Sequence, residues 1–171
     1  MRINYQKELG EKTKSFDLQI IKGKECYTIK CLNKDDVEMG FVTFKIYNDI
    51  LWIYKLETNS KFYRQGVASA IVDITEFFAI KHGANRVEGK FFPTNEYARP
   101  FYEKNGYFVP NKVKSWDNYD PCWIMYKVLN PKEITQKVAP NIKAYKYATI
   151  NQHAKKQNSI QESALCQNNY S

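Results

Sequence analysis

Hydrophobic and polar residues alternate along much of the first sixty positions. Residues 16–20 and 27–31 show this alternation on either side of a turn at Gly23. The same pattern returns in residues 42–47 and 50–58, which are joined by a tight turn. Successive side chains of a strand point to opposite faces of a sheet, so the alternation predicts strands with one buried face. We therefore predict an antiparallel meander of about four strands.

The pattern changes to a helical period after residue 66. The apolar positions that define the stripe of the first helix are Val67, Ala70, Ile71, Ile74, Phe77 and Phe78. This helix is predicted to end at His82-Gly83, because glycine readily takes the left-handed conformation that closes helices. A strand over residues 86–92 and a helix over about 95–104 follow, and Asn105-Gly106 stops that helix.

Two further strands, at residues 107–109 and 122–129, are predicted to close the domain, with a polar loop between them. A strand–helix–strand unit after a meander implies a parallel pair within a mostly antiparallel sheet. The predicted fold class is therefore α+β.

The two ends of the chain differ from this core. Residues 1–14 are polar and charged without a clear period, and a helix is left open there. Residues 131–171 are rich in Lys, Asn and Gln. We predict one folded domain over residues 1–130 and a basic polar tail over 131–171 that is helical in part and disordered at its end.

Composition narrows the range of partners. The 171 residues carry a net charge of +8, and 43% of them are hydrophobic, enough to bury a core. Six lysines against two glutamates in residues 131–171 account for half of that net charge. A basic chain suits anionic partners such as a phosphorylated cofactor or nucleic acid. The domain itself is only mildly basic, which weakens the case for a nucleic-acid-binding domain.

Other classes are disfavoured by what the sequence lacks. It has no apolar run long enough to cross a membrane and no hydrophobic N-terminal segment typical of secretion signals. Four cysteines in such a chain indicate reduced thiols and a cytoplasmic location. Two distant histidines, His82 and His153, argue against a zinc site or a cysteine–histidine catalytic pair, so we predict no metal.

The stretch FYRQGVASAIVD, which opens the first helix, invites a phosphate-binding interpretation. A Walker loop would need a Gly-Lys-Ser/Thr ending, and a dinucleotide fingerprint would need three glycines. The third interpretation is a row of backbone amides over residues 64–69 directed at an anion on the helix N-terminus. Gly66 would let the anion approach and Ala68 would keep the next turn clear. An ordinary strand–helix turn that needs a glycine explains Gly66 equally well.

A second motif, NEYARPFYEKNGYFV at residues 95–109, changes this balance. Together with YRQGVA it resembles the GNAT superfamily of acyl-CoA-dependent N-acetyltransferases. That superfamily pairs an Arg/Gln-x-x-Gly-x-Gly/Ala loop with a downstream Asn-x-x-Ala-x-x-Phe-Tyr-x-x-x-Gly-Phe helix. The resemblance covers roughly residues 36–129. It implies a mixed, mostly antiparallel sheet that is splayed at the cofactor strand and flanked by helices.

The resemblance also implies a site. The loop amides would bind the pyrophosphate of the cosubstrate acetyl-CoA, the strand before them would pair with its pantetheine arm, and the asparagine opening the second helix would touch that arm. Tyr102 would be the catalytic residue, donating a proton to the departing thiolate. The residues assigned to the cofactor are Leu56, Thr58, Arg64, Gln65, Gly66, Val67, Ala68, Ser69 and Asn95.

The chain departs from the family pattern at several points. Tyr63 stands where Arg or Gln is usual, and Pro100 lies inside the second helix. The two helices that usually follow the first strand have no counterpart around Gly23. The general base is not assigned, since Glu57 and Glu88 are both candidates and an amine that arrives unprotonated needs none.

We therefore expect an N-acetyltransferase that moves an acetyl group from acetyl-CoA to a primary amine of a small molecule or a protein. A toxin-type enzyme acting on aminoacyl-tRNA and a non-catalytic CoA-binding module are the alternatives. Nucleic-acid binding without acetyl transfer is disfavoured, because the aromatic residues alternate as strand-core residues do. No membrane partner is expected, and a homodimer is left open.

Overall fold

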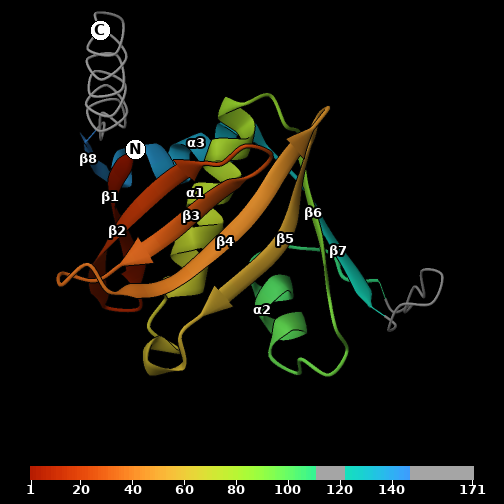
Figure 1. Ribbon diagram of the computed structural model, residues 1–171, viewed down its shortest axis with the longest axis horizontal. Coiled ribbons are helices and arrows are strands. Elements are labelled where there is room, and N and C mark those ends of the chain that lie inside the picture. The colour runs from red at the N-terminus through yellow and green to blue at the C-terminus, as the bar shows by residue number, and fades with distance from the viewer. Residues whose placement is uncertain (111–121, 147–171) are drawn as a thin grey trace, which may run out of the picture.

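The computed structural model describes residues 1–110 and 122–146, which build one eight-stranded sheet with helices packed on it (Figure 1). The strand order is β7-β6-β5-β4-β3-β2-β1-β8, and all neighbours are antiparallel except β5 and β6. This confirms the predicted α+β class with one parallel pair. The elements are β1 (Arg2–Leu9), β2 (Lys12–Lys22), β3 (Tyr27–Leu32), β4 (Glu38–Tyr47), β5 (Ile50–Thr58), η1 (Ser60–Phe62), α1 (Val67–Lys81), β6 (Arg86–Phe91), α2 (Ala98–Lys104), β7 (Trp123–Val128), α3 (Pro131–Val138), η2 (Ala139–Asn141) and β8 (Ile142–Lys146).

The meander is confirmed and has one strand more than predicted. Residues 1–14 hold β1 and the start of β2. The possibility of a helix in this segment, which the sequence analysis left open, is therefore wrong. The first side chains of β1 do alternate, since Ile3 and Tyr5 are buried. The next inward position is Lys7, whose ammonium pairs with the buried carboxylate of Asp73. A lysine at an inward position hides the strand period from a pattern that counts apolar residues.

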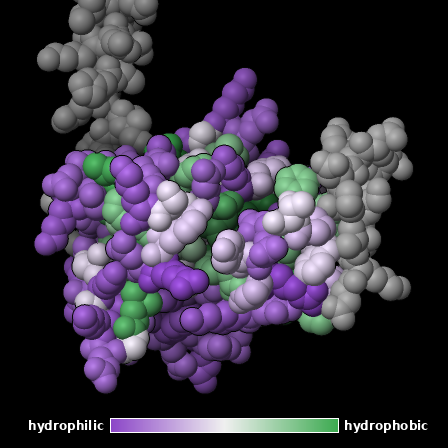
Figure 2. Space-filling model, turned by 90° about the horizontal axis from the view of Figure 1, so that it is seen from below, coloured by the Kyte–Doolittle hydropathy of each residue, from purple (hydrophilic) through white to green (hydrophobic). Residues whose placement is uncertain are grey.

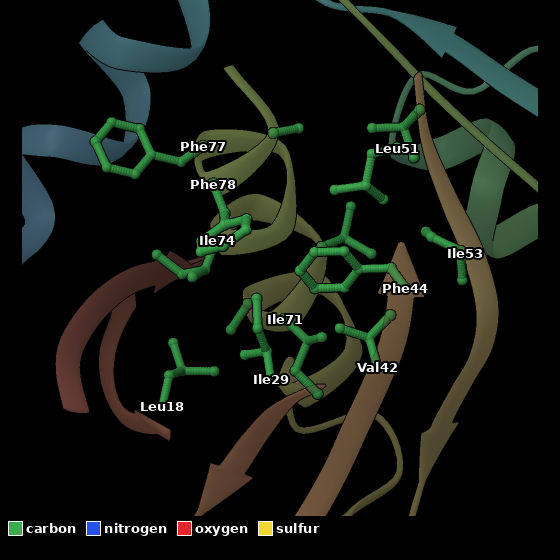
Figure 3. Packing of buried hydrophobic residues seen from close by; sticks show 14 of the residues in the cluster. Leu18, Ile29, Val42, Phe44, Leu51, Ile53, Ile71, Ile74, Phe77 and Phe78 are labelled. Carbon is green, nitrogen blue, oxygen red and sulfur yellow. The ribbon is translucent and has the colours of Figure 1, made fainter. Parts of the chain in front are cut away.

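The core lies between the sheet and α1. Figure 3 shows Ile71 of α1 near Ile29 of the sheet, with Phe44 and Phe78 close by. The last two rings meet edge to face at a centroid distance of 5.4 Å. α1 contacts the strands from β2 to β6 and, on its other side, α3. It ends at Lys81, and Gly83 has a φ of +81°, as the sequence predicted.

α1 carries a buried carboxylate at Asp73, on the side away from the sheet centre. The Tyr5 hydroxyl donates to it at 2.9 Å, and the ammonium of Lys137 on α3 donates at 2.7 Å. Lys7 of β1 completes the set of donors. A buried charge without partners would strongly destabilise the fold. β1 and α3 are therefore fixed to α1 by the need to satisfy this carboxylate.

A second buried carboxylate, Glu76, ties the other end of the sheet to the same helix. Lys127 of β7 donates to both of its oxygens at 2.9 Å and to the carbonyl of Asn105 at 3.0 Å. Burial raises the pKa of Glu76, while the nearby charge of Lys127 opposes that shift. Because β1 and β7 lie near opposite ends of the sheet order, the sheet must curve around α1 for both to reach it.

Residues 131–146, which the sequence analysis placed in a tail, are packed on the domain. Asn130 caps α3 by accepting from the amides of Lys132 and Glu133, at 3.1 and 3.3 Å. Ile134 and Val138 are buried in the core, and β8 pairs with β1. Residues 131–138 thus form a helix and residues 142–146 an edge strand of the sheet. A domain boundary after residue 130 stays a prediction, and residues 147–171 lie outside the described residues.

The second predicted helix is shorter than its pattern suggested. α2 begins at Ala98, so Pro100 is its third residue, where no helical hydrogen bond needs its amide. The strand predicted at residues 107–109 is wrong, since only a single bridge joins Phe108 to Tyr126. The predicted polar loop falls largely on residues 111–121, outside the described residues.

Packing of α3 on the core predicts a stability effect. Replacing Ile134 by alanine should lower the free energy of unfolding by about 2–5 kcal/mol, because it leaves a cavity in a buried site. Gln136→Ala, on the exposed side of α3, is the matched control and should change little. Urea unfolding measures both. Equal small effects would mean that α3 is not docked on the domain.

Candidate active site

β5 and β6 stop pairing half-way along β5. Their parallel pairing runs from Ile50 opposite Arg86 to Ile53 opposite Gly89 and then stops, although β5 continues to Thr58. Beyond this point, among residues 1–110 and 122–146, only β4 pairs with the backbone of β5. The sheet is therefore splayed at the strand that the resemblance assigned to the cofactor.

A bulge in β5 lies at the point of divergence. Thr43 of β4 faces Lys55, and Phe44 faces Ile53, so Tyr54 is an extra residue in β5. Such a bulge bends the strand and increases its twist. Figure 2 shows the molecule from the side on which β5 ends and α2 lies, and hydrophobic residues gather at the centre of this face among hydrophilic ones.

The loop between η1 and α1 leaves backbone amides free. α1 makes its first helical bond from the amide of Ala70 to the carbonyl of Gly66, at 2.9 Å. It has no side-chain cap and no acidic residue in its first turn. Within residues 1–110 and 122–146, no acceptor is found for the amides of Arg64, Gly66, Val67, Ala68 and Ser69.

The conformation of this loop brings those amides together. Arg64 and Gly66 have φ values of +57° and +84°, in the left-handed region. Backbones that turn in this way form concave nests of N–H groups that bind anions. The positive end of the dipole of α1 adds to the same field. The residues present thus fit a phosphate or pyrophosphate group, held by amides with little need of side chains.

Tyr102 lies on α2 and faces β6. Its ring stacks on Phe91 at 5.5 Å and meets Phe101 and Tyr107 edge-on at 5.2 and 5.4 Å. The side chain is 6% exposed, and burial raises the pKa of its phenol to about 12. No hydrogen bond to this hydroxyl comes from the described part of the chain. The phenol is therefore protonated at neutral pH and has a proton to donate.

The other predicted cofactor residues are spread around the divergence. Leu56 and Thr58 stand opposite Val42 and Gly40 at the free end of β5. Asn95 is exposed in the turn before α2, where its amide bonds to a carbonyl three residues earlier.

Two cavities adjoin the predicted cofactor residues, and neither is lined by all of them. One of about 400 Å³ is lined by Glu57, Thr58 and Tyr63, and another of about 760 Å³ by Ser69 and residues of β1, β7 and α3. Tyr102 lines neither of them.

The two candidate bases are already paired. Glu57 is exposed and lies 2.6 Å from the ammonium of Lys55, and Glu88 is paired with Arg86. No hydrogen bond joins either glutamate to Tyr102 within the described residues. The general base therefore stays unassigned.

Sequence reasoning missed the buried acids of α1. Asp73 and Glu76 lie three residues apart inside an otherwise apolar helix, which was the available signal. Among the described residues there is no group of His, Cys, Asp or Glu suited to hold a metal ion. No helix in that part of the chain is long and apolar enough to cross a membrane.

Comparison with solved structures gives several acetyltransferases of the same fold. A ribosomal-protein-S18-alanine N-acetyltransferase from Escherichia coli has 16% identity and a TM-score of 0.51, covering 61% of this chain and 70% of its own. Nourseothricin acetyltransferase has 15% identity and a TM-score of 0.56, with coverages of 74% and 84%. The PaiA N-acetyltransferase of Thermoplasma acidophilum, solved with coenzyme A, has 20% identity and a TM-score of 0.53, with coverages of 61% and 62%.

These identities are low and show the fold alone. No curated protein matches the sequence. A family model does, however: the model of the acetyltransferase (GNAT) family matches residues 3–107, which is more than half of the chain and runs from the second residue of β1 to beyond the end of α2. The chain therefore belongs to the GNAT acetyltransferase family.

Proposed function

We propose that this protein is an N-acetyltransferase that moves an acetyl group from acetyl-CoA to a primary amine within a ternary complex. The observation that carries the proposal is the row of free amides at the start of α1, which follows the strand that leaves its neighbour. An anionic cosubstrate with a long flexible arm suits both features. Its pyrophosphate would accept hydrogen bonds from the amides of residues 64–69, and its arm would pair with the free edge of β5.

The Tyr63 departure is compatible with this binding mode. Its side chain is 60% exposed, and the amides that follow it do not depend on the side chain at that position. Arg64 is exposed next to it and supplies a cation that can approach a phosphate. The absence of an acidic residue from the first turn of α1 leaves the anion without a competitor.

The chemistry proposed for the site needs two contributions from the chain. A thioester carries an electrophilic carbonyl, and an amine that attacks it forms a C–N bond as the C–S bond breaks. A backbone amide of β5 beyond Ile53, where the pairing with β6 stops, would donate to the carbonyl oxygen as negative charge develops there. Tyr102 would give its phenolic proton to the departing sulfur. The amine would release one proton to solvent, and the phenolate of Tyr102 would take one proton back from solvent.

The acceptor is proposed only as a class. The relatives named above are described as acting on an alanine of a ribosomal protein and on nourseothricin. We propose a primary amine of a small molecule or a protein. A location in the cytoplasm likewise stays a prediction.

A second candidate function is a CoA-binding module without catalysis. The burial of Tyr102 among three aromatic rings favours it, because the same residue serves the core whether or not it donates a proton. The two candidates share the amide site and differ only in turnover.

The binding site can be tested at Ala68, a partly exposed residue in the first turn of α1. Wild-type protein should gain roughly 2.7 kcal/mol of stability when acetyl-CoA is present at about a hundred times its Kd. Ala68→Glu should lose most of this gain, since a carboxylate beside the amides repels the pyrophosphate. Without ligand it should be at least as stable as wild type, because an acidic residue in the first turn favours the helix.

Ala68→Gln is the matched control, having the same size without the charge, and should keep most of the gain. Thermal unfolding with acetyl-CoA, and with ATP as a comparison ligand, measures all three proteins. Equal gains in the Glu and Gln variants would place the anion elsewhere.

Turnover separates the two candidate functions. Tyr102→Phe removes the proton donor and should lower kcat by about 10²–10⁴-fold, the range of general acid catalysis, while Kd for CoA stays unchanged. Release of CoA thiol from acetyl-CoA, with a panel of primary amines, measures the rate. Wild-type activity should show no loss attributable to Tyr102 ionisation up to about pH 11, since its pKa lies near 12. Unchanged turnover in Tyr102→Phe would remove this residue from the mechanism.

A further inference from the structure

The inner row of β1 runs along α1 and reaches the loop that precedes it. Ile3, Tyr5, Lys7 and Leu9 are alternate residues of this strand and face one side. Tyr5 and Lys7 both donate to Asp73 of α1. The row continues by one more inward position, Leu9, before the chain turns back into β2.

Leu9 packs directly on Gly66. A Cβ added to Gly66 would lie 2.4 Å from Cδ1 of Leu9 and 2.9 Å from Cδ2, distances far below van der Waals contact. The leucine side chain therefore covers the bare backbone of the one glycine in the loop. Gly66 is needed here twice, for its φ of +84° and for the space that Leu9 fills.

Within the part of the chain that the structure describes, few hydrogen bonds hold the loop in its left-handed form. The amide of Gln65 bonds to the carbonyl of Phe62 at 3.4 Å, a long distance, and its side chain donates to the carbonyl of Lys61 at 3.2 Å. Arg64 has a φ of +57°, which is unfavourable for a residue other than glycine. Strained backbone of this kind persists only where its surroundings fix it. Leu9 supplies packing that the loop's own hydrogen bonds do not.

We infer that Leu9 is a positioning residue for the phosphate-binding loop. Through Leu9, the β1–β2 hairpin sets the loop geometry in which the amides of residues 64–69 hold the CoA pyrophosphate. This inference rests on the proposed function. The anchor of the hairpin is the set of donors from β1 to Asp73, and Leu9 transmits its position to Gly66. Without the leucine side chain, the loop samples conformations in which the amides no longer converge.

The consequence is a change in binding that leaves the chemical step intact. Apparent Kd rises in inverse proportion to the fraction of molecules that hold the competent loop. The ring contacts of Tyr102 within the described residues come from Phe91, Phe101 and Tyr107, and none of these belongs to the hairpin. Loss of Leu9 should therefore raise KM for acetyl-CoA and leave kcat nearly unchanged.

The test compares three substitutions at Leu9 with one control in the full chain. Leu9→Ala removes the contact, Leu9→Val shortens it, and Leu9→Met restores its volume. Ile3→Ala is the control, because it also removes a buried side chain from β1 but lies six residues, roughly 20 Å of strand, from Leu9. Calorimetric titration with CoA gives Kd, steady-state kinetics with acetyl-CoA give KM and kcat, and urea unfolding gives the stability of each variant.

We expect Leu9→Ala to raise Kd and KM by about tenfold, corresponding to a tenth of the molecules holding the competent loop. Leu9→Val should have a smaller effect, Leu9→Met should bind like wild type, and Ile3→Ala should lose stability without a change in Kd. If Leu9→Ala does not fold, the Leu9→Val and Leu9→Met pair decides the question.

Unchanged or tighter CoA binding in Leu9→Ala would overturn the inference, and tighter binding would mean that Leu9 occupies the path of the anion. An equal loss of affinity in Ile3→Ala would overturn it too, because the effect would then follow stability. Absence of CoA binding by the wild-type protein would overturn the proposed function itself, which is a separate result.

Discussion

The structure depends on enclosing one helix while leaving its first turn open. α1 is covered by the curved sheet on one side and by α3 on the other. Its two buried carboxylates, Asp73 and Glu76, are satisfied by lysines from three different elements. At its N-terminus the enclosure stops, and the amides of Arg64 and residues 66–69 have no acceptor within the described residues. A helix fixed at its middle and open at its start presents its dipole to an anion without having to move.

The divergence of β5 from β6 lies next to this proposed anion site along the chain. If the two strands stayed paired, the edge of β5 beyond Ile53 would be used by the sheet. The bulge at Tyr54 bends the strand where pairing ends, and the free part of β5 leads along the chain to the loop before α1. One ligand with a phosphate at one end and a reactive carbonyl at the other matches this sequence of features. Tyr102 of the second helix stacks on Phe91, the last residue of β6, just beyond the point where β5 and β6 diverge.

Much of this could be predicted from sequence because the strands from β2 to β5 and helix α1 follow regular periods. The parts that were missed are those in which polar residues occupy inward positions. Lys7 interrupts the apolar pattern of β1. Its inward position is explained only by its partner, Asp73, which lies 66 residues away in the sequence. α3 has only two buried apolar residues, and its docking depends on α1 as well as on its own sequence. The bond from Lys137 to Asp73 is equally non-local.

The candidate site divides in the same way. The glycine turn and the Asn-to-Gly helix motif are local, so the loop and Tyr102 could be proposed as site residues from the sequence. The contact of Leu9 with Gly66 joins residues 57 positions apart and leaves no local signal. The buried setting of Tyr102 also depends on tertiary structure, since Phe91 and Tyr107 come from other elements.

The most direct test of the central claim is a titration of ¹⁵N-labelled protein with CoA, followed by amide NMR spectra. The account predicts that the largest shift changes fall on the amides of residues 64–69, because these donate to the pyrophosphate. Amides in the middle of α1, such as those of Asp73 and Glu76, should move little. Changes concentrated around Lys137 and Lys127 with the loop unaffected would contradict the account, since the anion would then bind on the outer side of α1.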